Sequence, residues 1–162
     1  MADSPLLQKH HQEIARATAA AMQQHFSETV EICSELITSD LYTQMEAAGL
    51  KQEARQAKAE TRLMMATAMH YTDCHHDDVL KVLNYALDSP PAVQKDVYFT
   101  IAVVQLSAER PADARVAMQT CLTLISDLKR AGAPEAENVD QQEREALEFL
   151  EQLAPLQRGP VN

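Results

Sequence analysis

Residues 63–91 and 98–126 carry the same pattern of large and small side chains, displaced by 35 positions. The aligned pairs are Leu63 with Tyr98, Ala66 with Ile101, Thr67 with Ala102, Val79 with Ala114, Leu83 with Met118, Ala86 with Cys121 and Leu87 with Leu122. A period of about 34 residues is typical of repeats that each form one helical hairpin. Such a hairpin cannot bury its own apolar face, so hairpins stack and leave a grooved surface.

The composition favours helix along the whole chain. Of 162 residues only 4% are aromatic, Trp is absent, and the dominant Ala, Gln, Glu, Leu and Met lose little rotamer freedom in a helix. A chain of this length forms one domain with a sizeable core. We therefore predict an all-α protein with a single helical-repeat domain at residues 6–154. A disordered lead (1–5) precedes the domain, and a tail (155–162) follows it.

The predicted domain contains about three stacked hairpins, at residues 6–37, 51–88 and 93–130, and a capping helix at 140–154. Apolar residues recur at every third or fourth position in these segments, as one buried helix face requires. About 16 residues are inserted after the first hairpin, with Gly49 as the expected helix break. Residues 51–60 carry many charges and are expected to be solvated. Asp140 and Glu143 have the spacing of a capping pair.

The charge balance limits the choice of partner. Lys and Arg number 14 against 24 Asp and Glu, a formal net charge of −10. Nucleic-acid binding depends on cationic side chains that displace counterions, so it is disfavoured, and a basic or apolar partner fits better. No apolar run approaches the roughly 18 to 20 residues of a membrane span, so no membrane insertion is expected. The three cysteines form no metal or redox motif and no leader opens the chain, which predicts a cytoplasmic location.

The two better matched hairpins resemble the tetratricopeptide repeat (TPR). Each has a large residue early in its first helix (Leu63, Tyr98), a small one four positions later (Thr67, Ala102), and small or β-branched residues early in its second helix (Val79, Ala114), and Pro91 closes the second hairpin. Small residues let adjacent helices approach to roughly 8 to 10 Å. The repeat's usual glycines are missing here.

Three such hairpins with a capping helix, in an acidic chain, are similar to the class II chaperones of type III secretion systems. These are small cytoplasmic proteins that hold translocator subunits in a concave groove before export, often as dimers. The resemblance implies a chaperone or adaptor that binds a protein or peptide partner through an apolar segment. A homodimer is compatible with the same resemblance.

The residues that would line the groove lie on the first helix of each hairpin, opposite its contact with the second. The predicted partner-binding residues are Ile14, Met22, Met64, Ala68, Tyr71, Phe99, Val103 and Leu106. If these mostly apolar side chains were exposed together, they would form an apolar patch typical of an interaction site. The alternative is that the chain's own terminal helices cover these residues. A second functional hypothesis is a structural subunit whose same face is permanently filled in a protein complex.

Potential metal ligands gather in the turn of the second hairpin, at Asp73, Cys74, His75, His76, Asp77 and Asp78. A metal-binding protein that uses Cys74, His75 and His76 is a third hypothesis. The simpler interpretation is a polar turn in which Asp77 or Asp78 caps the next helix, because adjacent residues on a tight turn point in different directions. The pair His10 and His11 is expected to be solvated. Nucleophile elbows, phosphate loops and HExxH sequences are missing, so neither enzymatic activity nor a cofactor is expected.

Overall fold

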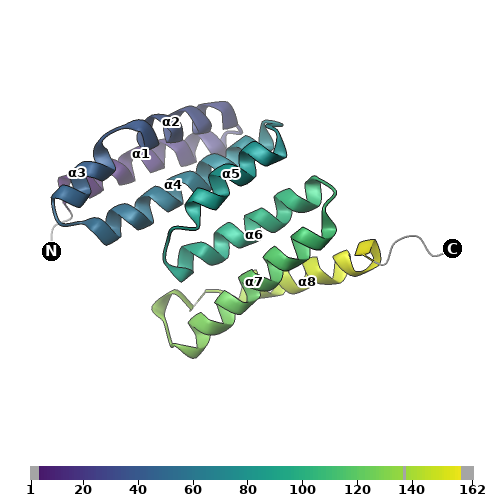
Figure 1. Cartoon of the computed structure of the whole chain (residues 1–162). Coiled ribbons are helices and arrows are strands. Elements are labelled where there is room, and N and C mark those ends of the chain that lie inside the picture. The colour runs from purple at the N-terminus through teal and green to yellow at the C-terminus, as the bar shows by residue number, and fades with distance from the viewer. Residues whose placement is uncertain (1–3, 137, 158–162) are drawn as a thin grey trace. The chain divides into compact units, whose positions relative to one another are not determined.

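The computed structural model describes residues 4–136 and 138–157 (Figure 1). These residues form helices joined by turns, and no strand occurs among them, which confirms the predicted all-α class. The chain divides into two compact units, Met1–Ser89 (unit 1) and Pro90–Asn162 (unit 2). None of the described helices is long and apolar enough to cross a membrane. The single domain at 6–154 stays a prediction.

Unit 1 contains five helices among its described residues: α1 (Pro5–Met22), α2 (Phe26–Thr38), α3 (Leu41–Ala47), α4 (Lys51–Tyr71) and α5 (His76–Ala86). Helix α2 packs against α1 and α4, and α5 also packs against α4. Ser4 caps α1 by accepting a hydrogen bond from the Leu6 amide at 3.3 Å, and Pro5 takes the first helical position, where it needs no donor. The remainder of the predicted lead, residues 1–3, lies outside the described residues.

The inserted segment forms the short helix α3, which folds back onto α1 and α4. Its side chains Leu41, Tyr42 and Met45 are buried together with Ala54 and Ala57 of α4. Gly49, at φ +86°, ends this helix as predicted. The expectation that residues 51–60 are solvated holds for the exposed charged side chains, such as Lys51 and Glu60. It is wrong for Ala54 and Ala57, which are buried against α3.

Unit 2 contains α6 (Pro91–Ser107), α7 (Pro111–Arg130), the short 3-10 helix η1 (Pro134–Ala136) and α8 (Asp140–Gln157). Helix α7 packs against both α6 and α8. Pro91 begins α6, where its fixed φ suits the first helical position. Helix α8 continues through Pro155 to Gln157, so the first three residues of the predicted tail are helical. The rest of that tail, residues 158–162, lies outside the described residues.

The predicted capping pair at the start of α8 has a different role. Asp140 and Glu143 both bind the Lys129 ammonium near the end of α7, at 2.8 and 3.1 Å. Their hydrogen bonds raise the pKa of Lys129, and Lys129 in turn lowers the pKa of Asp140. The spacing that resembles a capping box therefore serves a contact between helices.

Burial follows the 35-residue sequence repeat in the second helix of each better matched hairpin. Three aligned pairs are fully buried at 0% exposure: Val79 with Ala114, Leu83 with Met118, and Ala86 with Cys121. The sequence repeat thus marks equivalent core positions in α5 of unit 1 and α7 of unit 2.

Candidate protein-binding surfaces

In unit 2, one line of side chains on α6 lies beside α8. Asp96, Phe99, Val103 and Leu106 recur at helical spacing and share one side of α6. A second line lies on α8, where Gln142, Phe149 and Leu156 are spaced seven residues apart and so share one side of the helix. The two lines come together at their ends, where Gln142 bonds to Asp96 and where Leu156 and Leu106 line one pocket. We call Phe99, Val103, Leu106, Phe149 and Leu156 the α6–α8 face.

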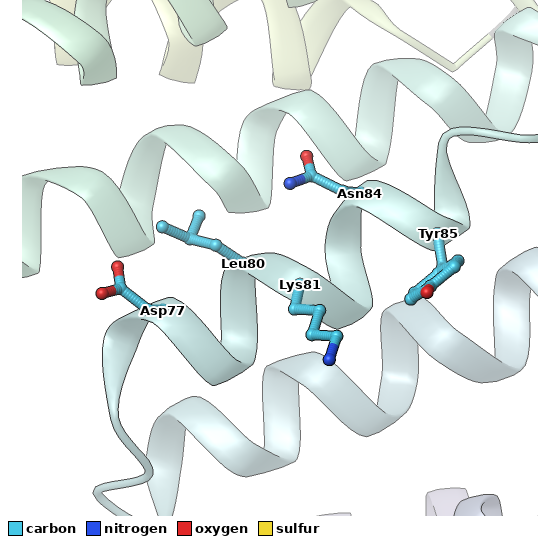
Figure 2. Close-up of a pocket in the computed structure, with 5 residues that line it drawn as sticks. All are labelled: Asp77, Leu80, Lys81, Asn84 and Tyr85. Carbon is cyan, nitrogen blue, oxygen red and sulfur yellow. The ribbon is translucent and has the colours of Figure 1, made fainter.

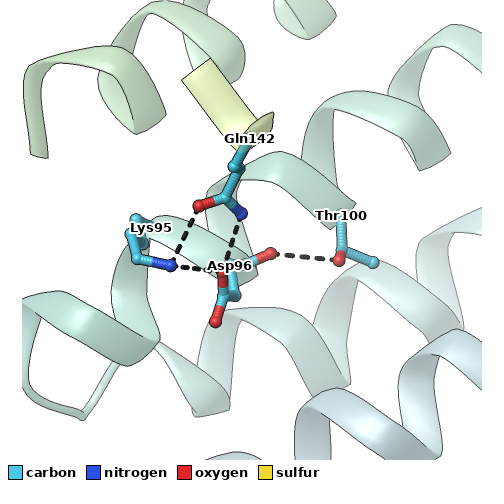
Figure 3. Close-up of polar contacts among 4 residues, drawn as sticks. All are labelled: Lys95, Asp96, Thr100 and Gln142. Carbon is cyan, nitrogen blue, oxygen red and sulfur yellow. Dashed lines mark hydrogen bonds and ion pairs between the residues drawn. The ribbon is translucent and has the colours of Figure 1, made fainter. Parts of the chain in front are cut away.

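A polar network joins the two lines at one end (Figure 3). The Lys95 ammonium donates to Asp96 Oδ1 at 2.8 Å and to Gln142 Oε1 at 2.9 Å. Gln142 Nε2 donates to the same Asp96 oxygen at 2.7 Å, and the Thr100 hydroxyl donates to the Asp96 carbonyl at 3.0 Å. Lys95 is only 9% exposed, so these partners compensate the burial of its charge.

Replacing Gln142 by Ala should lower the free energy of unfolding by roughly 1–3 kcal/mol, because a nearly buried ammonium and a carboxylate each lose a hydrogen-bond partner. Gln141→Ala is the matched control, since Gln141 is exposed and bonds only within α8. Its expected change is within about 0.5 kcal/mol. Urea titration of both variants measures the difference. Equal losses would show that Gln142 acts only through its helix propensity.

The other end of the two lines is an apolar pocket of about 300 Å³. It is lined by Leu106 of α6, Pro111 at the start of α7, Leu156 of α8, and Glu109 in the turn between α6 and α7. Glu109 has φ +60°, a left-handed conformation that closes this turn and is uncommon outside glycine. Leu156 is 59% exposed. The pocket thus combines an accessible apolar wall with one carboxylate.

Leu106 is among the predicted groove residues, whereas Leu156, Phe149 and Pro111 are not. Leu156 lies in the segment predicted as a tail, 155–162, but α8 continues to Gln157. The seven-residue interval from Phe149 to Leu156 was the signal that could have extended the helix. Phe99 and Val103 are half-buried, and their partner-binding role stays a prediction.

The predicted groove residues of unit 1 do not share one open face. Ile14 packs against the α3 cluster, Met64 packs against Ala17, Ile32 and Cys33, and Ala68 is 2% exposed. Met22 and Tyr71 are exposed at 81% and 61%. The Tyr71 ring stacks on Phe26 with centroids 4.8 Å apart. The partner-binding role of these residues stays a prediction.

A buried polar chain links three helices of unit 1. His10 Nδ1 lies 3.2 Å from the Tyr42 hydroxyl, which lies 2.7 Å from Thr61 Oγ1, and Thr61 donates to the Ala57 carbonyl at 2.8 Å. His10 is 2% exposed, so the expectation of a solvated pair is wrong for this residue. Burial, reinforced by the neighbouring His11, lowers the pKa of His10 to about 4.

The cluster at the α4–α5 turn makes local contacts. His75 caps α5 by accepting a hydrogen bond from the Asp77 amide at 3.2 Å, so the cap is not Asp77 or Asp78 as expected. Cys74 Sγ lies 3.4 Å from the Thr72 hydroxyl, and the His75 and His76 rings are 6.5 Å apart. Across residues 4–136 and 138–157, no group of three or more His, Cys, Asp or Glu side chains has a geometry that could hold a metal ion.

One side of α5 lines a further pocket in unit 1, through Asp77, Leu80, Lys81, Asn84 and Tyr85 (Figure 2). The guanidinium of Arg62 from α4 lies 5.3 Å from the centroid of the Tyr85 ring. This contact ties the accessible side of α5 to a cation on the neighbouring helix.

Comparisons of the chain with protein-family models, with curated proteins and with solved structures find no match.

Proposed function

We propose that this protein is a cytoplasmic chaperone or adaptor that holds an apolar segment of a partner protein against the α6–α8 face. The observation that carries the proposal is the pocket at the end of that face. Its two leucines, Leu106 and Leu156, come from two helices, and Leu156 is 59% exposed. Accessible apolar side chains that converge on a concave site are typical of binding surfaces.

The pocket also indicates the chemistry of the bound segment. About 300 Å³ lies at the lower end of the range for ligand pockets and suits one or two apolar side chains. Glu109 at the same site favours a Lys or Arg next to the apolar anchor, since opposite charges at the rim of an interface improve specificity. A basic and apolar segment also complements a chain of net charge −10.

The proposal includes stacked TPR-like hairpins and, as its most specific form, a type III secretion translocator chaperone. Its support is the 35-residue sequence repeat and the matching burial of aligned positions in α5 and α7. Each of these helices packs along the helix before it, α4 or α6. A holding function requires that the client be released to its next partner.

The test uses the polypeptide that the tagged full chain retains from its native cell, identified and then purified. The variant Leu106→Asp with Leu156→Asp should raise the Kd of that polypeptide at least about tenfold, because a carboxylate in the pocket is desolvated on binding. The matched control carries Val116→Asp and Leu147→Asp, two exposed apolar residues of unit 2 outside the pocket, at 63% and 50% exposure. The control should bind as the wild type does.

Two outcomes would contradict the proposal. Equal weakening in both double variants would show that binding depends on apolar surface or charge in general. A complex that stays associated on dilution would indicate a permanent structural subunit rather than a holding protein. Circular dichroism of all variants checks that the helices are intact.

A further inference from the structure

One side of α4 in unit 1 carries a line of basic residues. Lys51, Arg55, Lys58 and Arg62 are spaced four, three and four positions apart and so lie on the same side of the helix. We call these four residues the basic stripe. They are four of the 14 Lys and Arg residues of a chain whose net charge is −10. The stripe therefore has the opposite sign to the chain as a whole.

The basic stripe lines a single hollow of about 110 Å³. Gln52 of α4 also lines it, and Glu46 of α3 and Asp88, just after α5, contribute one carboxylate each. All the lining residues belong to unit 1. Four cations thus face a shared concave surface that contains only two acidic groups.

Two of the cations are held in position by aromatic rings. The Lys58 ammonium lies 6.0 Å from the centroid of the Tyr42 ring, which is itself 2% exposed and fixed by the hydrogen bond to Thr61. The Arg62 guanidinium lies 5.3 Å from the centroid of Tyr85. Cation–π contacts of this kind restrict long side chains before a ligand arrives, which reduces the entropy lost on binding.

Among residues 4–136 and 138–157, most of the stripe has no carboxylate partner. Arg55 pairs with Asp88 at 2.8 Å, with both side chains largely exposed. Within the described part of the chain, Lys51, Lys58 and Arg62 form no ion pair. Three cations on one stripe are therefore available to an anionic ligand, and a ligand carboxylate could also displace Asp88.

We propose that the basic stripe binds an acidic segment of a partner protein, independently of the α6–α8 face. From Lys51 to Arg62 the stripe is about 17 Å long at 1.5 Å per helical residue. An extended segment of about five residues has the same length, and its alternate side chains, about 6.6 Å apart, can each reach a cation of the stripe, where successive positions are about 4.5 to 6 Å apart along the helix. A nucleic acid is disfavoured, because its charged backbone would extend beyond the stripe onto a surface of the same sign.

The test measures the binding of the full chain to a fluorescent peptide of alternating glutamate and serine, amidated at its C-terminus. Fluorescence anisotropy should show binding that weakens as salt is added, since the contacts are exposed ion pairs. A peptide with glutamine in place of glutamate should not bind. An oligothymidylate of similar length should bind more weakly than the acidic peptide, and tighter binding of the oligonucleotide would overturn the choice of ligand.

Variants locate the binding on the stripe. Lys51→Gln with Lys58→Gln and Arg62→Gln should raise the Kd about tenfold, because each exposed ion pair contributes only modestly. The control Lys9→Gln with Arg130→Gln and Arg144→Gln removes the same charge elsewhere and should change the Kd less than about twofold. Asp88→Asn should strengthen binding by releasing Arg55. Equal loss in both triple variants, or no binding by the wild type, would overturn the proposal.

Discussion

Replacing Leu83 or Met118 by Ala should lower the free energy of unfolding by about 2–5 kcal/mol in each case. Both side chains are 0% exposed and occupy aligned positions of the sequence repeat, Leu83 in unit 1 and Met118 in unit 2. The loss combines the transfer free energy of the removed methylene groups with the cavity that the surrounding helices leave unfilled. Urea titration followed by circular dichroism measures it.

The matched controls for these core variants are Val116→Ala and Leu147→Ala, whose side chains are 63% and 50% exposed. Their expected change is within about 0.5 kcal/mol. If the Leu83 or Met118 variant were as stable as these controls, the aligned positions would not be core positions. The correspondence between the sequence repeat and burial would then fail.

The stability of unit 1 should fall as the pH drops from 6.5 to about 4, because of His10. Burial lowers the pKa of His10 to about 4 in the folded protein, against 6.5 for an ordinary histidine. Below pH 6.5 the unfolded chain therefore binds a proton that the folded chain does not accept. The contribution is fully present above pH 6.5, and up to about 3 kcal/mol is lost by pH 4.

Other groups near His10 shape this pH dependence. His11 on the same helix disfavours the charged ring, while Glu53 and Glu60 of α4 line the same pocket, of about 170 Å³, and the Tyr42 hydroxyl contacts Nδ1. Carboxylates elsewhere also titrate in this range, so the informative quantity is the difference between the wild type and His10→Leu. That variant should lose less stability between pH 6.5 and 4.

His11→Leu is the control for the pH experiment. It should keep most of the wild-type fall in stability, because burial is the larger cause of the lowered pKa of His10 and His11 the smaller. The fall should be slightly shallower, since removal of a neighbouring positive charge raises the pKa of His10. Parallel curves for the wild type and His10→Leu would show that His10 titrates normally in the folded protein.

Local signals in the sequence predicted most helix positions. Pro111 marks a helix start and Gly49 a helix end. Both act through their own backbone preferences, so no contact with a distant part of the chain is needed. Pro155 lies inside α8, two residues before its last residue, so the usual preference against proline inside helices did not mark the end of this helix. His75 was missed as a cap because histidine is not among the usual capping residues.

The candidate surfaces were less predictable, since each depends on residues that are distant in the sequence. Leu106 was identified from its helix face, but the pocket also needs Leu156, 50 positions later. His10 shares one helix side with the partly buried Leu7 and Ile14 and the buried Ala17, a spacing visible in the sequence, but its hydrogen-bond partner Tyr42 comes from α3. The many charges at residues 51–60 are visible in the sequence. That Lys51, Arg55, Lys58 and Arg62 line one hollow is visible only in the structure.

The 35-residue sequence repeat by itself determined the helical class and the equivalent core positions, such as Leu83 and Met118. It could do so because helical periodicity and side-chain size are properties of neighbouring residues. Only the tertiary structure decided which apolar side of α6 lies beside α8, where α3 folds back, and which cations remain unpaired. Those outcomes depend on which helices meet, and hence on free energies of burial and pairing that no single segment contains.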